Sequence, residues 1–172
     1  MPCPKPSPKP NPKPSPNPDP DPGKSTAIHI LCGLVKPTSG GATIFGHDVS
    51  SALGAIRAIS GVCPQHDLLF NELTVIQHIA LFAGIKGAHP AKAQDETATW
   101  LERLGLGHKA NSKASELSGG QRRKVSLIIA LVASPKFLLL DEPAAGMDPE
   151  SRRAVWEFIL ASKVGHAALL TL

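Results

Sequence analysis

The sequence predicts an α/β fold with a parallel sheet at its core. From residue 25 onward, segments with helical spacing of apolar residues alternate with short apolar runs, as in strand–helix–strand units. Two segments, KFLLLDEP at 136–143 and GHAALLTL at 165–172, contain continuous apolar runs, FLLL at 137–140 and AALL at 167–170. A strand has this pattern when both of its faces are buried, as in a parallel sheet covered by helices. The 172 residues are enough for one domain with a real core.

Each element has its own signal along the chain. Ile28, Leu31 and Leu34 recur at helical spacing, and the PTSGG segment after them breaks the helix. Trp100, Leu101 and Leu104 give a later helix one apolar face. We expect helices over 25–34, 50–59, 73–86, 91–105, about fifteen residues from 118 to near 135, and 149–161, with strands in 42–46, 61–65, 136–141 and 165–172.

The first 22 residues form a different kind of segment. Proline occupies every even position from 2 to 22, which is eleven of the 17 prolines in the chain. Such a tract forms neither a helix nor an interior strand. We therefore expect a disordered, extended proline-rich tail over 1–22 and one domain over 23–172.

Composition excludes several classes of protein. The net charge is +4, there is no Tyr, and no basic stripe is interleaved with aromatic residues, so nucleic acid is not expected as a partner. The three cysteines form no CxxC pair, which favours free thiols in a reducing compartment. The first 22 residues lack the apolar core of a signal peptide, and no apolar stretch reaches the ~20 residues of a membrane helix.

The FLLLDEP segment is the first candidate for chemistry. It places Asp141 and Glu142 after an apolar strand, at the strand end where open α/β sheets bind ligands. An aspartate there can hold Mg²⁺, and the adjacent glutamate can polarise a water for attack on phosphorus. Acidic residues after a strand are also common in ordinary surface turns, so this motif alone leaves both interpretations open.

The LSGGQ segment at 117–121 strengthens the phosphate interpretation. Ser118, Gly119 and Gly120 open a predicted helix. Two glycines let a phosphate approach the backbone, and a helix N-terminus supplies N–H donors. The alternative is a flexible cap before a core helix. The downstream DEP and the upstream Gly23-Lys24-Ser25-Thr26, which is how a phosphate-binding loop ends, favour a nucleotide site.

These motifs together resemble the nucleotide-binding domain of an ABC transporter. The segments VCPQHDLLFNELTV, LSGGQ, FLLLDEP and AAGMD are similar to the family's Q-loop, signature, Walker B and D-loop, and they stand in family order. PTSGGATIFGHDV and DEPAAGMDPESRRAVWEFI are similar to the A subfamily, whose members move lipids. The resemblance covers 23–172. It implies a P-loop NTPase fold with a parallel-sheet core and a helical subdomain at about 68–130.

The resemblance implies ATP and Mg²⁺ as ligands and gives roles by position. Lys24 would contact the β- and γ-phosphates, Glu142 would be the general base, and Gln65 would sense the metal and the attacking water. The implied nucleotide-binding residues are Gly23, Lys24, Ser25, Thr26, Ser118, Gly119, Gly120, Gln121 and Asp148. The implied metal ligands are Ser25, Gln65 and Asp141.

The resemblance also implies partners. A second cassette would hold the ATP that Ser118 and Gly120 contact, with Asp148 across the seam between the two cassettes. Gln65 would link the cassette to transmembrane domains supplied by other segments or chains. The expected location is the cytoplasmic side of a membrane, and the expected function is the coupling of ATP binding and hydrolysis to transport of a lipid.

The phosphate-binding loop departs from the family pattern G-x-x-x-x-G-K-[ST]. Counting back from Gly23 places Pro18 where the first glycine belongs, and Pro20 and Pro22 follow. Three backbone N–H donors are therefore absent. Hydrogen bonds to charged groups are worth roughly 1.5–3 kcal/mol each, so about 5–9 kcal/mol is lost, against ~8 kcal/mol for micromolar affinity.

This departure supports a second hypothesis, a truncated and catalytically inactive cassette that neither binds nor hydrolyses ATP alone. In the family, a strand and an adenine-stacking aromatic precede the loop, and a switch histidine would follow Leu172. A DNA-repair ATPase of the SMC type also has an LSGG signature, but a long coiled coil separates its two halves. Here Lys24 and Leu117 lie 93 positions apart with no heptad run between them, which disfavours that class.

Overall fold

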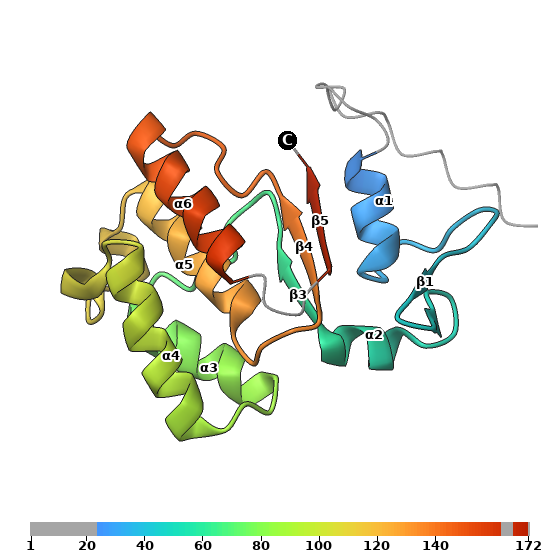
Figure 1. Cartoon of the computed structure of the whole chain (residues 1–172), viewed down its shortest axis with the longest axis horizontal. Helices are drawn as coiled ribbons and strands as arrows, with labels where there is room; N and C mark the ends of the chain where they lie inside the picture. Colours follow the sequence, from blue (N-terminus) through green and yellow to red (C-terminus); the bar gives the residue numbers. More distant parts are fainter. Residues whose placement is uncertain (1–23, 163–166, 172) are drawn as a thin grey trace, which may run out of the picture.

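The computed structural model describes residues 24–162 and 167–171 (Figure 1). The predicted tail at 1–22 lies outside the described residues. In chain order the elements are α1 (Lys24–Leu31), β1 (Thr43–Ile44), β2 (His47–Asp48), α2 (Leu53–Ile59), β3 (Ser60–Cys63), α3 (Val75–Ile85), α4 (Pro90–Arg103), the 3-10 turns η1 (Gly107–Lys109) and η2 (Ala114–Glu116), α5 (Gly119–Leu131), β4 (Phe137–Asp141), α6 (Pro149–Ala161) and β5 (Ala167–Thr171).

Three parallel strands form the sheet, in the order β3-β4-β5. The register pairs Val62 with Leu139 and Leu139 with Leu169. The α/β class and the parallel sheet predicted from the apolar runs are confirmed. Because β4 has a strand on each side, both of its edges are hydrogen-bonded. Its residues Leu138–Leu140 are also fully buried.

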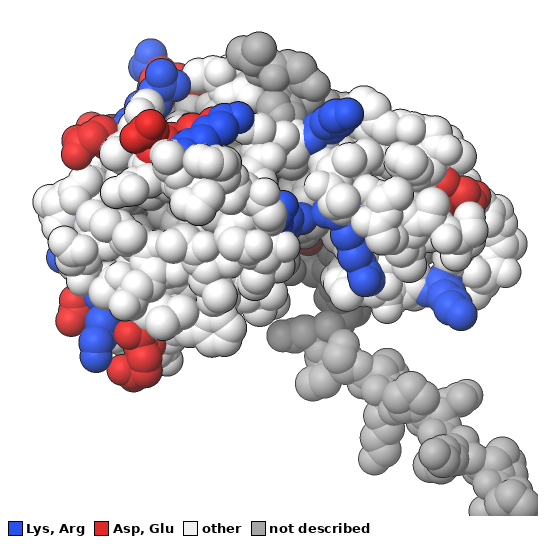
Figure 2. Space-filling view, turned by 90° about the horizontal axis from the view of Figure 1, so that it is seen from below, with Lys and Arg blue, Asp and Glu red and all other residues white. Residues whose placement is uncertain are grey.

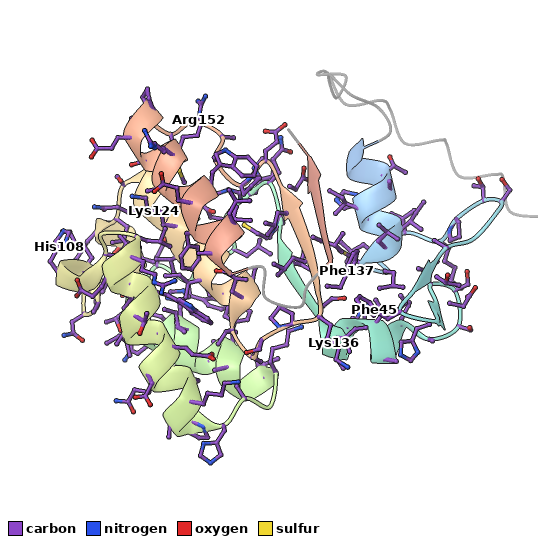
Figure 3. The ribbon with its side chains drawn as sticks, in the orientation of Figure 1. Phe45, His108, Lys124, Lys136, Phe137 and Arg152 are labelled. Atoms are coloured by element: carbon purple, nitrogen blue, oxygen red, sulfur yellow. The ribbon has the colours of Figure 1, made fainter. Side chains whose placement is uncertain are left out.

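Helices cover both faces of this sheet. In Figure 1, α5 and α6 lie on one side of the strands and α1 lies on the other. Leu138 and Leu140 belong to the large core that also contains residues of α5 and α6. Phe137, the first residue of β4, packs against a smaller core of Ile44, Val49 and Ile56, and Figure 3 shows it on the side of the strands that faces α1 and α2. Alternate side chains of one strand therefore enter two cores, as the two-residue period of a strand requires.

The strand β3 packs unusually close to α5. A Cβ placed on Gly61 would lie 1.8 Å from the carbonyl oxygen of Ala130. Glycine at this position lets the helix backbone rest directly on the strand. This contact fixes α5, which carries the LSGGQ motif at its N-terminus, relative to the sheet.

The helices α3 and α4 pack against each other and form a layer beside α5 and α6. Trp100 of α4 meets Phe158 of α6 edge-on, with ring centroids 6.4 Å apart. His78 of α3 is fully buried. Its Nε2 accepts from the backbone N–H of Phe70 at 2.8 Å, and its Nδ1 lies 2.9 Å from the carbonyl of Thr74. These bonds tie the segment between β3 and α3 to the helix.

The structure differs from the sequence prediction in detail. The strand expected at 42–46 is one arm of a two-stranded antiparallel hairpin, whose second arm His47–Asp48 was not predicted. The signature helix has 13 residues and ends at Leu131, before Pro135. It ends early because Ala133 and Ser134 have positive φ values of 68° and 50°, which no α-helix accommodates.

Two surface properties bear on function. Over the described residues, no helix is both long enough and apolar enough to cross a membrane. On the face shown in Figure 2, Lys and Arg side chains lie in several separate places with uncharged surface between them.

Candidate functional site

The candidate site lies at the carboxyl ends of β3 and β4. Cys63 pairs with Leu140 in the parallel register, so the residues that follow each strand leave the sheet at the same edge. Gln65 follows β3, and Asp141 and Glu142 stand at the end of β4. The structure therefore brings together the three residues expected to act on the metal and the attacking water.

The backbone turns sharply where β4 ends. Asp141 is 7% exposed, and Glu142 is half-buried with a φ of 46°. A glutamate in this left-handed region is strained, and such strain concentrates at functional sites. The turn directs the chain away from the sheet immediately after the two acidic residues.

Arg123 of α5 is the site residue that sequence reasoning missed. Its Nη1 donates to the carbonyls of Pro64 and, at 3.2 Å, Gln65. Its Nη2 donates to the carbonyls of Asp141 and, at 3.0 Å, Glu142. The signal was available in the sequence, because Arg123 precedes Leu127 by four residues and therefore lies on the buried face of α5.

The charge of Arg123 has a counterion at the same site. Asp67 Oδ1 lies 3.6 Å from its Nη1, and the two side chains are 19% and 6% exposed. The hydroxyl of Ser126 donates to the same carboxylate oxygen at 2.9 Å. Burial raises the pKa of the neighbouring Cys63 thiol to about 11, opposed by the positive charge of Arg123.

The N-terminus of α5 presents the signature at the surface. Ser118 Oγ accepts from the backbone N–H of Gln121 at 3.3 Å, and Gln121 Oε1 accepts from the N–H of Ser118 at 3.0 Å. This reciprocal pair is a capping box, and it fixes the first turn. Ser118 and Gly119 are exposed, so the first turn of the helix begins at the surface.

The segment after β4 returns to the signature. A Cβ on Gly120 would lie 3.9 Å from the side chain of Met147, which is buried. The next residue, Asp148, caps α6 by accepting from the N–H of Ser151 at 2.9 Å. That hydrogen bond lowers the pKa of the Asp148 carboxyl. Gly120 and Asp148 are therefore held on one surface of the chain.

The remaining predicted residues lie at α1. Gly23 and the side chains of Lys24 and Ser25 lie outside the described residues. Lys24 begins α1, and Thr26 is exposed in its first turn. In Figure 1 the start of α1 is on the same side of the molecule as the ends of β4 and β5.

The residues that the family resemblance implies as metal ligands fit a magnesium ion chemically. A carboxylate, an amide oxygen and a hydroxyl, as on Asp141, Gln65 and Ser25, are the hard oxygen donors that Mg²⁺ takes. Within the described residues, no group of three or more His, Cys, Asp and Glu could hold a metal alone.

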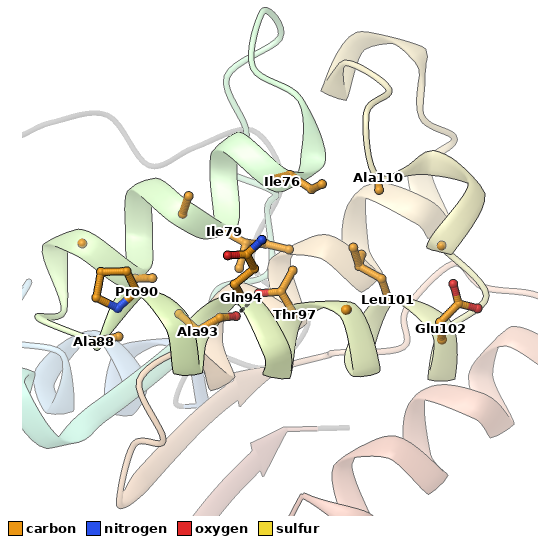
Figure 4. A pocket seen from close by; sticks show the side chains of 15 residues that line it. Ile76, Ile79, Ala88, Pro90, Ala93, Gln94, Thr97, Leu101, Glu102 and Ala110 are labelled. Carbon is orange, nitrogen blue, oxygen red and sulfur yellow. Dashed lines mark hydrogen bonds between the residues drawn. The ribbon is translucent and has the colours of Figure 1, made fainter.

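A separate apolar hollow of about 580 Å³ lies between α3 and α4 (Figure 4). Ile79, Ala83 and Leu101 line it. Its polar edge includes Thr97, whose hydroxyl donates to the carbonyl of Ala93 at 2.5 Å. It contains none of the residues at the strand ends.

Comparison with known proteins agrees with this arrangement. The sequence model of the ABC transporter family matches residues 22–145. In structure, the chain is similar to a protein described as the ATP binding subunit of an ABC transporter, with a TM-score of 0.78 and 29% sequence identity over 86% of this chain and 62% of that one. The chain belongs to the ABC transporter family and contains part of its ATP-binding cassette.

The similar sequences are those of A-subfamily transporters. Over 149 residues, or 87% of this chain, it is 44% identical to the human retinal-specific phospholipid-transporting ATPase ABCA4 and 46% identical to the human phospholipid-transporting ATPase ABCA3. It is 44% identical to ABC transporter A family member 6 of Dictyostelium discoideum. The matched region is 7% of the first protein's length and 9% of the other two. The resemblance to the A subfamily is thereby confirmed.

Proposed function

We propose that this cassette couples ATP to the movement of a lipid across a membrane, together with transmembrane domains supplied by other segments or chains. The substrate class is taken from the relatives, two of which are named as phospholipid-transporting ATPases. The cassette would act at the cytoplasmic side of the membrane. Its helical subdomain would be the region of about 68–130, which carries α3, α4 and most of α5.

We further propose that the chain acts through its signature face. The observation that carries this is the exposed, capped N-terminus of α5, with Ser118 and Gly119 at the surface. A helix N-terminus at the surface, with its backbone N–H donors and the positive end of its dipole, favours a phosphate that another molecule presents. A second, intact cassette would hold that ATP, and Asp148 would lie at the seam between the two.

The phosphate loop of this chain is the weaker half of the site. Pro18, Pro20 and Pro22 remove three backbone donors from the part of the loop that precedes Gly23. Asp19 and Asp21 add negative charge beside a polyanion. The proposal is therefore that the isolated chain binds ATP poorly and does not turn it over.

When bound, Mg²⁺ would neutralise phosphate charge, and Asp141, Gln65 and Ser25 would hold it. Glu142 would take a proton from the attacking water as general base. In the proposed pair of cassettes, Asp141, Gln65, Ser25 and Glu142 belong to the weak ATP site on this chain. The partner cassette supplies the ATP site that turns over, and the signature of this chain contacts it.

The test is phosphate release from Mg-ATP by the full chain alone, by an intact A-subfamily cassette alone, and by an equimolar mixture. The proposal expects no release by the chain alone and more release by the mixture than by the intact cassette. Turnover by the chain alone that is abolished by Glu142→Gln would show that its own loop suffices. A mixture no more active than the intact cassette would contradict the signature-face role.

A further inference from the structure

We infer that Arg123 is a positioning residue that holds the loop after β3 and the loop after β4 at one spacing and fastens both to the signature helix. The two loops carry Gln65 and Glu142, the residues proposed to act at the chain's own ATP site. One arm of the test below rests on the proposed function, and the other does not.

The geometry divides the guanidinium between the two loops. Nη1 donates to the carbonyls of Pro64 and Gln65, and Nη2 donates to those of Asp141 and Glu142. A guanidinium is planar and carries its N–H donors in a rigid fork, so the separation of its two terminal nitrogens sets the separation of the loops. A lysine ammonium has no such fork.

The loop after β3 is fastened to α5 at a second point. Asp67 supplies the counterion to Arg123 at 3.6 Å and accepts from the hydroxyl of Ser126 at 2.9 Å. Ser126 lies one helical turn beyond Arg123 on the same helix. A buried charge is retained only when it is paired and hydrogen-bonded, so this pair keeps the guanidinium in place.

Arg123 lies close to the signature on the same helix. It lies three residues after Gly120, within the same continuous hydrogen-bonded helix. A displacement of the exposed N-terminus of α5 therefore moves the carbonyls of Gln65 and Glu142 with it. Arg123 links contact at the signature to the geometry of the two loops.

The test compares Arg123→Met and Arg123→Lys with Arg122→Met in the full chain. Arg122 is the matched control because it is the neighbour on α5, yet its Nη1 contacts Asn71 Oδ1 and the Ala114 carbonyl instead. Amide hydrogen exchange is read from peptides covering 65–69, 142–147 and α3–α4. Arg123→Met is expected to speed exchange about tenfold to a hundredfold in both loops together, because hydrogen bonds from a charged group are lost. Exchange in the α3–α4 peptides is expected to stay as in the wild type.

The control variant and the lysine variant make this result specific. Arg122→Met is expected to leave both loops unchanged. Arg123→Lys is expected to fold and to speed exchange in at least one loop, because a single ammonium cannot serve both. Unchanged exchange in both loops in Arg123→Lys, or equal acceleration in every peptide of Arg123→Met, overturns the inference.

The second arm measures ATP turnover in a mixture with an intact cassette. The working site of this mixture is completed by the signature at the N-terminus of α5, and Arg123 fastens α5 to the two loops. Arg123→Met is therefore expected to lower the kcat of the stimulated reaction with KM unchanged, and Arg122→Met to leave both constants as in the wild type. Equal stimulation by Arg123→Met and wild type overturns the link to the signature. If the wild-type chain gives no stimulation, the proposed function fails, and the exchange data alone decide the role of Arg123.

Discussion

Gly61 lies directly beneath the carbonyl of Ala130, and a Cβ at Gly61 would stand 1.8 Å from that oxygen. The contact joins the central part of β3 to the last turn of α5. Through this contact, one residue without a side chain sets the distance between the sheet and the helix that carries the signature.

Gly61→Ala should therefore destabilise the chain. The added methyl group meets backbone atoms, which cannot rotate away, so either the helix or the strand must shift. Overpacking of this kind costs about 1–3 kcal/mol or more. Denaturant unfolding measures it, and Gly84→Ala is the matched control.

Gly84 lies inside α3, where a Cβ would meet nothing within 4 Å. Gly84→Ala should stabilise the chain by about 0.5–1 kcal/mol, because alanine loses less backbone entropy in a helix. Equal effects of the two substitutions would contradict the packing described for β3 and α5.

Gly119→Asp separates folding from function at the signature. A Cβ at Gly119 meets nothing within 4 Å, and an aspartate at the first position of α5 suits the helix dipole. The melting temperature should therefore be unchanged or slightly raised. Stimulation of an intact cassette should fall at least about tenfold, because the carboxylate repels the phosphate.

Gly119→Ala is the neutral control for this prediction. It places the same Cβ at the start of α5 without the charge, and it should retain most of the stimulation. Loss of stimulation in both variants would show that bulk, rather than charge, is excluded at this position.

Cys63 should make the chain less stable in alkali. Burial raises the pKa of its thiol from 9.0 to about 11 in the folded chain. Because the folded pKa lies above the unfolded value, the stabilising contribution is fully present below pH 9 and is lost as the pH rises toward 11. The loss amounts to about 2–3 kcal/mol by pH 11. Urea unfolding at pH 8, 9.5 and 11 measures it.

Cys63→Ala is the comparison for the alkaline effect. This variant starts from lower stability, because it leaves a small cavity, but its stability should fall less between pH 9 and 11. The same slope in variant and wild type would assign the alkaline loss to other groups, Cys32 among them, whose pKa burial also raises.

His78→Leu should loosen the segment before α3. The substitution leaves the backbone N–H of Phe70 without the imidazole acceptor that it has at 2.8 Å. An unsatisfied donor costs about 1–3 kcal/mol. His108, which is exposed and labelled in Figure 3, provides the control His108→Leu, with an expected change within about 0.5 kcal/mol. Urea unfolding of the two variants distinguishes them.

The sequence by itself determined the class of fold and most of its elements. The continuous apolar run 137–140 predicted a strand buried on both faces, and the structure places it between two parallel neighbours. Ser118 marked the start of the signature helix, because a side-chain oxygen at that position satisfies a free backbone donor. These are local signals, readable within a few residues.

Only the tertiary structure decided which distant residues meet. Arg123 of α5 contacts one loop 58–59 residues before itself in the sequence and another 18–19 residues after itself. No local pattern specifies which carbonyls a buried guanidinium will reach. The closeness of Gly61 to Ala130 depends likewise on how a strand and a helix 69 positions later pack. The left-handed turn at Glu142 lies where β4 ends beside the loop after β3. Residue type and spacing define the chemical groups, whereas long-range packing sets the distances between them.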